Sequence, residues 1–312
     1  MALGGFHRIS LQSTMAIAQR HAEAYIKTHF NQLDSERLSY LFQRNGQELE
    51  FVVKELWEEL QSSEFYPIGF EVEFGDGGQI GAIQIPGREL AAQLRGFVDR
   101  VDVWSDGRKN YFRVVDYKTG KKDFDYCDIF NGIGLQMLLY LFALEDDGCS
   151  LIGEDAVAAG VQYFPARAPY LLVDGIQDMA AIADSRAKAW KRKGLLLNDL
   201  DVLGAMSPDI YSSRLCFNVK KDGSISGDIA DTSQFKILRA YVFTLLGKIV
   251  DEIASGCIDP NPYTRGSSDN ACRFCPYTQI CHSENVVGRR NYKTMTAQRF
   301  WEDIEKAVHT NG

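Results

Sequence analysis

This 312-residue sequence lacks long apolar runs. None of its stretches approaches the roughly 20 apolar residues of a membrane-spanning helix, which predicts a protein without a membrane segment. Its first residues, MALGGFHRIS, lack the apolar core of a secretory signal peptide and so predict a cytoplasmic location. A Walker A motif is also missing, and this absence excludes an ATP-driven motor within the chain.

An excess of positive charge is missing as well. The net charge of −8 at pH 7 argues against a surface coated with phosphate-binding residues. The hydrophobic fraction of 45% and the charged fraction of 24% are those of an ordinary globular protein. A protein that binds DNA in one cleft can still be acidic elsewhere. Two local basic clusters are present, one of Lys118, Lys121 and Lys122 and one of Lys188, Lys191, Arg192 and Lys193.

Seven cysteines are present, but a cytoplasmic location argues against disulfides. Three of them, Cys272, Cys275 and Cys281, form a C-x2-C-x5-C run that offers three thiolates in one loop. Zinc would need a fourth ligand, for which the adjacent His282 is available. An iron–sulfur cluster would need a fourth cysteine, which can be distant in the sequence. The spacing therefore predicts a metal centre and leaves both kinds open.

The stretch between residues 94 and 141 organises the rest of the chain. Two runs within it, 96–102 and 111–118, alternate apolar with polar residues and are rich in β-branched and aromatic side chains. The pair Asp106-Gly107 between them favours a tight turn. These features predict a β-hairpin, and an apolar pattern with helical spacing follows it.

The second run of this hairpin ends with Asp116, Tyr117 and Lys118. Because alternate strand residues share a face, Asp116 and Lys118 point one way and Tyr117 the other. Asp99 on the partner strand can face Asp116 if the register suits. Two carboxylates and an ammonium group are costly to bury together without a ligand, and hard oxygen ligands suit Mg²⁺ or Mn²⁺. The alternative is a surface hairpin whose charges are all solvated.

Such an ion would activate water and neutralise the charge that develops on a phosphate during its transfer. Lys118 would stabilise the reacting phosphate or orient the attacking water. The hairpin therefore predicts chemistry on phosphodiester bonds.

Three motifs support this interpretation. They are GxxDRxD at Gly96 to Asp102, DYKTG at Asp116 to Gly120, and QxxxY at Gln136 and Tyr140. In this order and spacing the sequence resembles the RecB-like branch of the PD-(D/E)xK nuclease superfamily. The resemblance implies an α/β fold with a mixed central sheet flanked by helices, together with N-terminal helices and a C-terminal cysteine-bearing segment.

The resemblance also implies roles for individual residues. It makes Asp99, Asp116 and Lys118 catalytic and places Gln136 and Tyr140 near the active site. A metal-binding glutamate precedes GxxD in such nucleases, and Glu71 in the run FEVEFG matches it. The implied metal ligands are Glu71, Asp99, Asp116 and the carbonyl group of Tyr117, and the implied ion is Mg²⁺ or Mn²⁺.

Two further segments resemble AddB (RexB)-type components of bacterial helicase–nucleases that process double-strand breaks. They are GVQYFPA at 160–166 and DNACRFCPYTQIC at 269–281. The resemblance implies a deoxyribonuclease, and more specifically an exonuclease, that takes a single-stranded DNA end in its cleft. It also implies an ATP-driven partner. In that family a histidine precedes the core, and His7 is the candidate here.

The same resemblance implies a [4Fe–4S] cluster held by Cys272, Cys275, Cys281 and a fourth cysteine upstream of the core. The first cysteine of this sequence is Cys127, which lies inside the core. A chain that lacks the upstream part of such a protein would account for the missing cysteine. We therefore expect this chain alone to hold a cluster poorly or not at all.

Two other functions remain open. One is a stand-alone RecB-like iron–sulfur exonuclease of the CRISPR-associated type. The other is a catalytically silent DNA-binding or scaffold module that keeps the nuclease fold. Intact Asp99, Asp116 and Lys118 argue against the silent module.

The predicted organisation has three parts that form one compact unit: a helical extension at 1–65, a nuclease core at 66–255 and a cysteine segment at 256–312. We expect helices at 10–28, 38–60, 129–144, 178–193 and 233–255, strands at 68–75 and 156–164, a loop-rich segment at 197–208 and a hairpin at 215–225.

Overall fold

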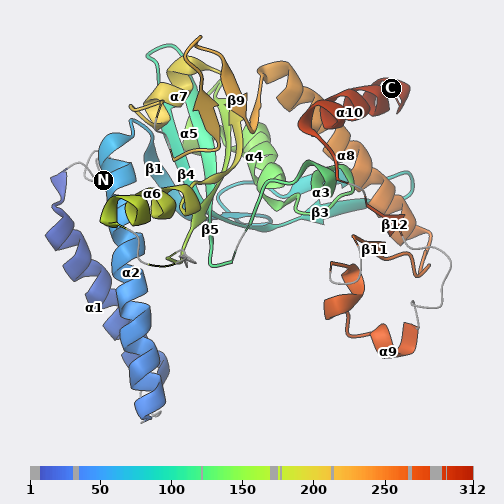
Figure 1. Ribbon diagram of the computed structural model, residues 1–312. Coiled ribbons are helices and arrows are strands. Elements are labelled where there is room, and N and C mark those ends of the chain that lie inside the picture. Colours follow the sequence, from blue (N-terminus) through green and yellow to red (C-terminus); the bar gives the residue numbers. More distant parts are fainter. Residues whose placement is uncertain are drawn as a thin grey trace. The chain divides into compact units, whose positions relative to one another are not determined.

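A computed structural model describes most of the chain (Figure 1). Contacts between residues divide it into two units, which we treat separately. The first unit comprises 1–81, 95–124 and 137–232, and the second comprises 82–94, 125–136 and 233–312. The three-part division expected from the sequence follows chain order and stays a prediction. The described residues are 8–30, 35–120, 122–168, 175, 178–211, 214–265, 269–281, 290–292 and 294–311.

A mixed six-stranded sheet forms the centre of the first unit. Its strand order is β1-β4-β5-β6-β7-β10. Strands β1, β4 and β5 are antiparallel neighbours, β5 and β6 are parallel, β6 and β7 are antiparallel, and β7 and β10 are parallel. This architecture confirms the predicted α/β class. The strands are β1 (Tyr66–Phe74), β4 (Gly96–Ser105), β5 (Asn110–Lys118), β6 (Val157–Pro165), β7 (Lys193–Leu197) and β10 (Ile229–Ala230).

The predicted hairpin is formed by β4 and β5, whose register pairs Arg100 with Val115 and Ser105 with Asn110. Asp106 closes the turn because its carboxylate accepts hydrogen bonds from two backbone N–H groups that follow it, both at 2.7 Å. Gly107 adopts the left-handed region there, with φ of 84°, which glycine allows at no steric cost.

The C-terminal half of long helix α2 (Glu36–Ser62) packs against one face of the sheet, and its N-terminal half extends beyond the strands. Its side chains Phe51, Val52 and Leu56 pack against a buried cluster of Val115, Phe164 and Trp190. Helix α1 (Leu11–Phe30) packs on α2 and has no buried residue of its own. The other helices of this unit are α4 (Gln136–Asp147), α5 (Cys149–Ile152), α6 (Met179–Ala189) and α7 (Leu200–Met206), and a small hairpin is formed by β8 (Phe217–Val219) and β9 (Ile225–Gly227).

The second unit is built around α8 (Thr232–Ala254). The Tyr241 hydroxyl on α8 donates a 2.6 Å hydrogen bond to the Phe130 carbonyl group. Tyr126 packs its ring against Phe300, with centroids 5.1 Å apart. The other elements are β2 (Ile83–Pro86), β3 (Ala91–Leu94), α3 (Tyr126–Phe130), β11 (Tyr263–Thr264), η2 (Ala271–Phe274), α9 (Thr278–Cys281), β12 (Arg290–Asn291) and α10 (Ala297–Asn311).

Three local predictions differ from the structure. The helix expected at 178–193 ends at Ala189, and Lys193 begins strand β7. The single helix expected at 129–144 is two helices, because Gly132 and Gly134 adopt left-handed φ values of 81° and 71° between α3 and α4. The segment 197–208, expected as a loop, contains α7. Asp199 caps this helix by accepting hydrogen bonds from two backbone N–H groups, a signal present in the sequence.

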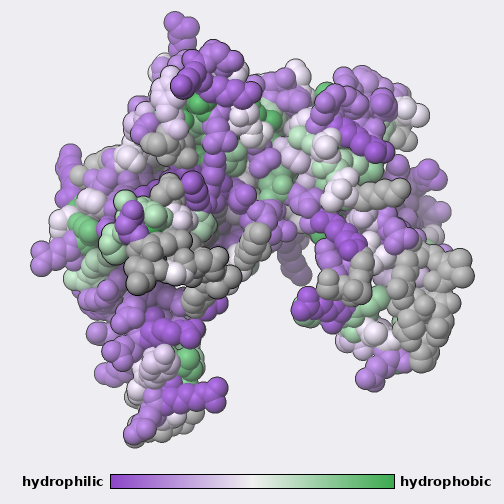
Figure 2. Space-filling view, in the orientation of Figure 1, coloured by the Kyte–Doolittle hydropathy of each residue, from purple (hydrophilic) through white to green (hydrophobic). Residues whose placement is uncertain are grey.

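Hydrophilic side chains cover most of the face visible in Figure 2, with small apolar areas between them. Among the described helices, none is both long and apolar enough to cross a membrane.

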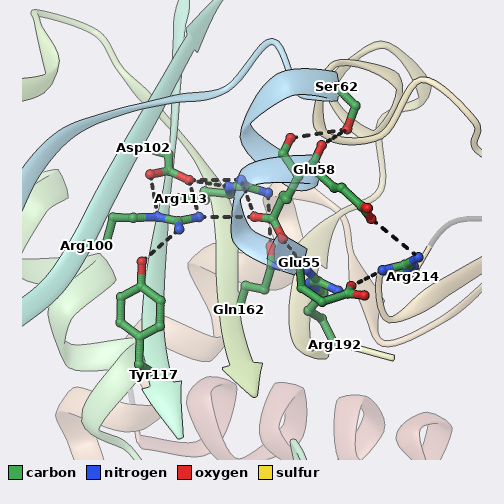
Figure 3. A network of polar contacts seen from close by, with 11 residues as sticks. Glu55, Glu58, Ser62, Arg100, Asp102, Arg113, Tyr117, Gln162, Arg192 and Arg214 are labelled. Carbon is green, nitrogen blue, oxygen red and sulfur yellow. Dashed lines mark hydrogen bonds and ion pairs between the residues drawn. The ribbon is translucent and has the colours of Figure 1, made fainter. Parts of the chain in front are cut away.

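A buried network of charges joins α2 to the sheet (Figure 3). Asp102 forms ion pairs with Arg100 at 2.8 Å and with Arg113 at 2.9 Å. Glu59 of α2 contacts the same two arginines at 3.1 and 3.2 Å, and Arg192 at 2.8 Å. All five side chains are at least nine-tenths buried. Buried charges without partners are costly. Each of the two carboxylates therefore offsets the charge of more than one arginine.

Burial alone would raise the pKa of Glu59, but the charges of Arg192, Arg113 and Arg100 outweigh it and hold the pKa at about 2. Because this value is below the usual 4.5, the ionised carboxylate stabilises the folded protein. That contribution is complete above pH 4.5 and is lost as the pH falls toward 2.

We expect Glu59→Gln to lower the free energy of unfolding at pH 7 by about 3–5 kcal/mol, because it leaves buried arginine charge unpaired. Urea denaturation measures this loss, which should shrink below pH 4.5 as the parent loses the same charge. Glu58→Gln is the control, since this neighbour has a 40% exposed side chain and should cost less than about 1 kcal/mol. An equal loss of unfolding free energy in the two variants would contradict the conclusion that the buried network stabilises the fold.

Candidate active site

Asp116 and Lys118 lie on one face of β5, as strand alternation predicts. The Lys118 ammonium group is 2.7 Å from Asp116 Oδ2. Asp116 is 2% exposed, and the Lys118 side chain is about one-third exposed. The Tyr117 ring lies on the opposite face, where it packs against Phe164. The pair is thus a buried carboxylate with a cation at the edge of solvent.

Asp99 on β4 completes this arrangement. Its Oδ2 atom accepts a 3.0 Å hydrogen bond from the backbone N–H group of Tyr117, so its carboxylate lies beside the strand that holds Asp116. Asp99 is partly buried. The structure therefore brings together two carboxylates and one ammonium group from neighbouring strands.

Burial raises the pKa of Asp116 above its usual value of 3.8. The neighbouring Lys118 ammonium group lowers it, the charge of Asp99 raises it again, and the charge of Lys122 lowers it. The net upward shift means that the surroundings disfavour the ionised carboxylate. An added positive charge would relieve that penalty.

Glu71 lies on β1, beside the same strand pair. Its neighbours Phe70 and Val72 pair with Arg100 and Val98, so Glu71 is level with Asp99. Its φ of 48° is in the left-handed region, which is unusual for glutamate, and its side chain is exposed. Backbone strain of this kind is concentrated at functional sites.

Gln136 and Tyr140 have different environments on α4. Gln136 is the first residue of the helix and is exposed. Tyr140 is 7% exposed, and its ring packs edge-on against Phe74, with centroids 5.3 Å apart. Their predicted roles near the active site stay predictions.

The three clustered cysteines follow one another through short turns. The Cys275 N–H group donates to the Cys272 carbonyl group at 3.2 Å, and Thr278 Oγ1 donates to the carbonyl groups of both cysteines. Cys272 is partly exposed, whereas Cys275 and Cys281 are exposed. His7, Lys121 and His282 lie outside the described residues.

A cavity of about 580 Å³ lies beside Lys118. We call it the basic groove. Its apolar lining includes Pro165 and the edge of the otherwise buried Trp190. Lys193 in the groove forms a 3.2 Å ion pair with Asp123, and both side chains are about half exposed. Its cations are Lys118, Lys122, Arg167, Lys191 and Lys193.

The fold and this site define a class of nuclease. The sequence matches the PD-(D/E)XK nuclease superfamily over residues 3–282, so the chain belongs to that superfamily. Such nucleases typically use a divalent metal ion.

More particularly, the chain is homologous to the AddB component of bacterial ATP-dependent helicase/deoxyribonucleases. It is 33% identical to the one from Moorella thermoacetica over 268 residues, which are 84% of this chain and 23% of the relative. It is 32% identical to the one from Clostridium acetobutylicum over 288 residues, with coverages of 89% and 25%. The chain thus spans about a quarter of the length of these relatives. The resemblance drawn from the sequence motifs is confirmed.

The residues present fit a divalent ion. Asp116 Oδ2 is buried and makes no hydrogen bond of good geometry, although it is ion-paired with Lys118. Within the described residues, no three His, Cys, Asp or Glu side chains lie close enough to form a metal site. Mg²⁺ commonly needs only one or two carboxylates, because waters and substrate phosphates supply the other ligands. Asp99 and Asp116 match that requirement.

Sequence reasoning missed most of the basic groove and the buried charge network. The basic cluster at 188–193 is visible in the sequence. A cluster of this kind is most often a solvated surface, and no local sequence feature indicates that β7 lies near Lys118. Arg167 lies two residues after the end of β6, which pairs with β5, and this sheet position could have indicated the groove.

Since the pKa of Asp116 is raised, its ionised form destabilises the metal-free protein at neutral pH. We expect Asp116→Asn to be more stable than the parent at pH 7 in EDTA. The gain should vanish below pH 3.8, where both folded and unfolded parent carry a neutral Asp116. Thermal unfolding at several pH values measures it.

Asp106→Asn serves as the control. Backbone hydrogen bonds from Lys109 and Arg108 lower the pKa of this exposed aspartate, so its substitution should bring no gain. A loss of stability in Asp116→Asn at pH 7 would show that the ion pair with Lys118 outweighs the burial.

Proposed function

We propose that this chain is a divalent-metal-dependent deoxyribonuclease that hydrolyses phosphodiester bonds. The observation that supports it best is the pairing of buried Asp116 with Lys118 at 2.7 Å, beside the Asp99 carboxylate. A raised pKa at one carboxylate, with a second carboxylate and a cation next to it, is typical of a catalytic site.

Asp99 and Asp116 would hold the ion, with Glu71 and the Tyr117 carbonyl group as further ligands. A divalent ion supplies an activated water and neutralises charge on the phosphate. The Lys118 ammonium group would stabilise negative charge on the phosphate oxygens. Gln136 and Tyr140 are proposed to support the substrate or the ligands.

The basic groove is the proposed path of the DNA strand. Its cations can contact phosphates, and its apolar lining can contact bases, a combination typical of proteins that bind single strands. A cavity of 580 Å³ suits a ligand of a few nucleotides. A single-stranded end is therefore the proposed substrate, and exonuclease action is the proposed mode.

The names of the relatives support a wider context. We propose that the chain acts as the nuclease part of a helicase–nuclease that processes double-strand breaks, together with an ATP-driven partner. A [4Fe–4S] cluster at Cys272, Cys275 and Cys281 belongs to the same proposal, with the fourth ligand outside the described core. A stand-alone exonuclease receives less support, because the similarity extends over more than four-fifths of this chain.

A catalytically silent DNA-binding module is the second candidate. The observation that favours it is the absence of three converging side-chain ligands among the described residues. Both candidates bind DNA, but only the nuclease cleaves it, so cleavage decides between them.

We expect Asp116→Ala to reduce Mg²⁺- or Mn²⁺-dependent cleavage of single-stranded DNA at least a hundredfold, about 2.7 kcal/mol in activation free energy. The reason is that the substitution removes a proposed metal ligand, whereas the protein should still fold without this carboxylate. Cleavage of a labelled oligonucleotide measures the rate, and Asp106→Ala on the distant hairpin turn is the control. A variant that cleaves as fast as the parent would remove Asp116 from the site.

We expect the double substitution of Lys122 and Lys193 by Gln to weaken DNA binding and flatten its dependence on salt. Two fewer phosphate contacts should reduce the slope of log K against log salt concentration by about 1.4 for a single strand. Binding is measured in EDTA, so that the DNA stays intact.

The matched control neutralises Lys220 and Lys221, two lysines near the turn between β8 and β9. It makes the same change in net charge at two residues that do not line the groove. An equal decrease in slope for both double variants would assign the effect to overall charge and not to the basic groove.

A further inference from the structure

Tyr117 is held from both sides of the sheet. Its backbone N–H group donates to Asp99 on the face of the candidate active site. Its hydroxyl, on the other face, accepts a 2.9 Å hydrogen bond from Arg100 Nη1. The ring also packs edge-on against Phe164, with centroids 5.4 Å apart. The residue between Asp116 and Lys118 is therefore fixed in position.

Arg100 is itself immobilised by the buried network (Figure 3). Its guanidinium group contacts both carboxylate oxygens of Asp102, at 2.8 and 2.9 Å, and Glu59 Oε1 at 3.1 Å. The side chain is fully buried. The N–H group that meets Tyr117 is consequently a donor with a fixed direction.

The two anchored residues are direct sequence neighbours of the two carboxylates. Arg100 follows Asp99 in β4, and Tyr117 follows Asp116 in β5. Consecutive strand residues point to opposite faces, so a rotation of either strand moves its anchor and its carboxylate together. A cross-strand bond on one face thereby limits the movement of the carboxylate pair on the other.

We propose that Arg100 and Tyr117 are positioning residues, whose hydrogen bond across β4 and β5 holds Asp99 and Asp116 at the separation that a divalent ion requires. This inference rests on the proposed function for the identity of its site. Tyr117 acts through its hydroxyl group and Arg100 through Nη1, and both side chains lie on the face of the sheet opposite Asp116 and Lys118.

The test compares Tyr117→Phe with Gln162→Met. The first variant removes the hydroxyl and keeps the ring. The second removes the 3.0 Å hydrogen bond that Arg113 Nη1 donates to Gln162 Oε1, elsewhere in the same buried network. Each change deprives one buried arginine of one acceptor, so the two variants are matched in their structural effect.

Titration with Mn²⁺, followed by the electron paramagnetic resonance signal of the free ion, gives the dissociation constant without catalysis. We expect Tyr117→Phe to raise this constant at least fivefold and Gln162→Met to leave it within twofold of the parent. At saturating Mn²⁺, Tyr117→Phe should also lower kcat for single-stranded DNA while KM stays unchanged, because the basic groove is untouched.

Equal Mn²⁺ affinities in both variants and the parent would overturn the inference, and so would an equal decrease in both variants. A Tyr117→Phe protein that fails to fold while Gln162→Met folds would assign the hydroxyl to stability and overturn it too. A parent protein that binds Mn²⁺ but leaves DNA intact would refute the proposed nuclease function. The Mn²⁺ affinities of the two variants would still decide whether Tyr117 is a positioning residue. A parent that binds no Mn²⁺ would overturn the inference.

Discussion

Strand β5 carries the residues of the candidate active site on one face and residues packed against α2 on the other. The site depends on this alternation of successive side chains. One face presents Asp116 and Lys118, and the other presents Arg113, Val115 and Tyr117 to α2 and the buried charges. Since successive residues point to opposite sides, neither face can shift without the other. Ion pairs between three buried arginines and two carboxylates join the second of these faces to α2, and breaking such buried pairs is strongly destabilising.

The candidate active site, by contrast, contains an arrangement that lowers stability. Burial and the neighbouring Asp99 carboxylate raise the pKa of Asp116, and the folded protein maintains this unfavourable arrangement. Stable packing elsewhere compensates for it, as in many active sites where stability is sacrificed for function. The left-handed conformation of Glu71, level with Asp99, is a second strained feature in the same region.

Much of this was visible in the sequence because it is local. Alternation and an Asp-Gly turn predicted the hairpin, and with it the shared face of Asp116 and Lys118. The break between α3 and α4 was missed because an apolar pattern continues through Gly132 and Gly134, whose left-handed conformations end the helix. The charge network was missed for a different reason. Glu59, Arg100 and Arg192 are far apart in the chain, and only the folded sheet shows that they meet.

The central claim is that Asp99 and Asp116 share a divalent ion. Anomalous diffraction from crystals soaked in Mn²⁺ tests it most directly, because the method locates the metal itself. The account predicts one strong peak between the two carboxylates, at about 2.0–2.4 Å from an oxygen of each. A peak elsewhere, or none at a Mn²⁺ concentration that supports cleavage, would contradict it.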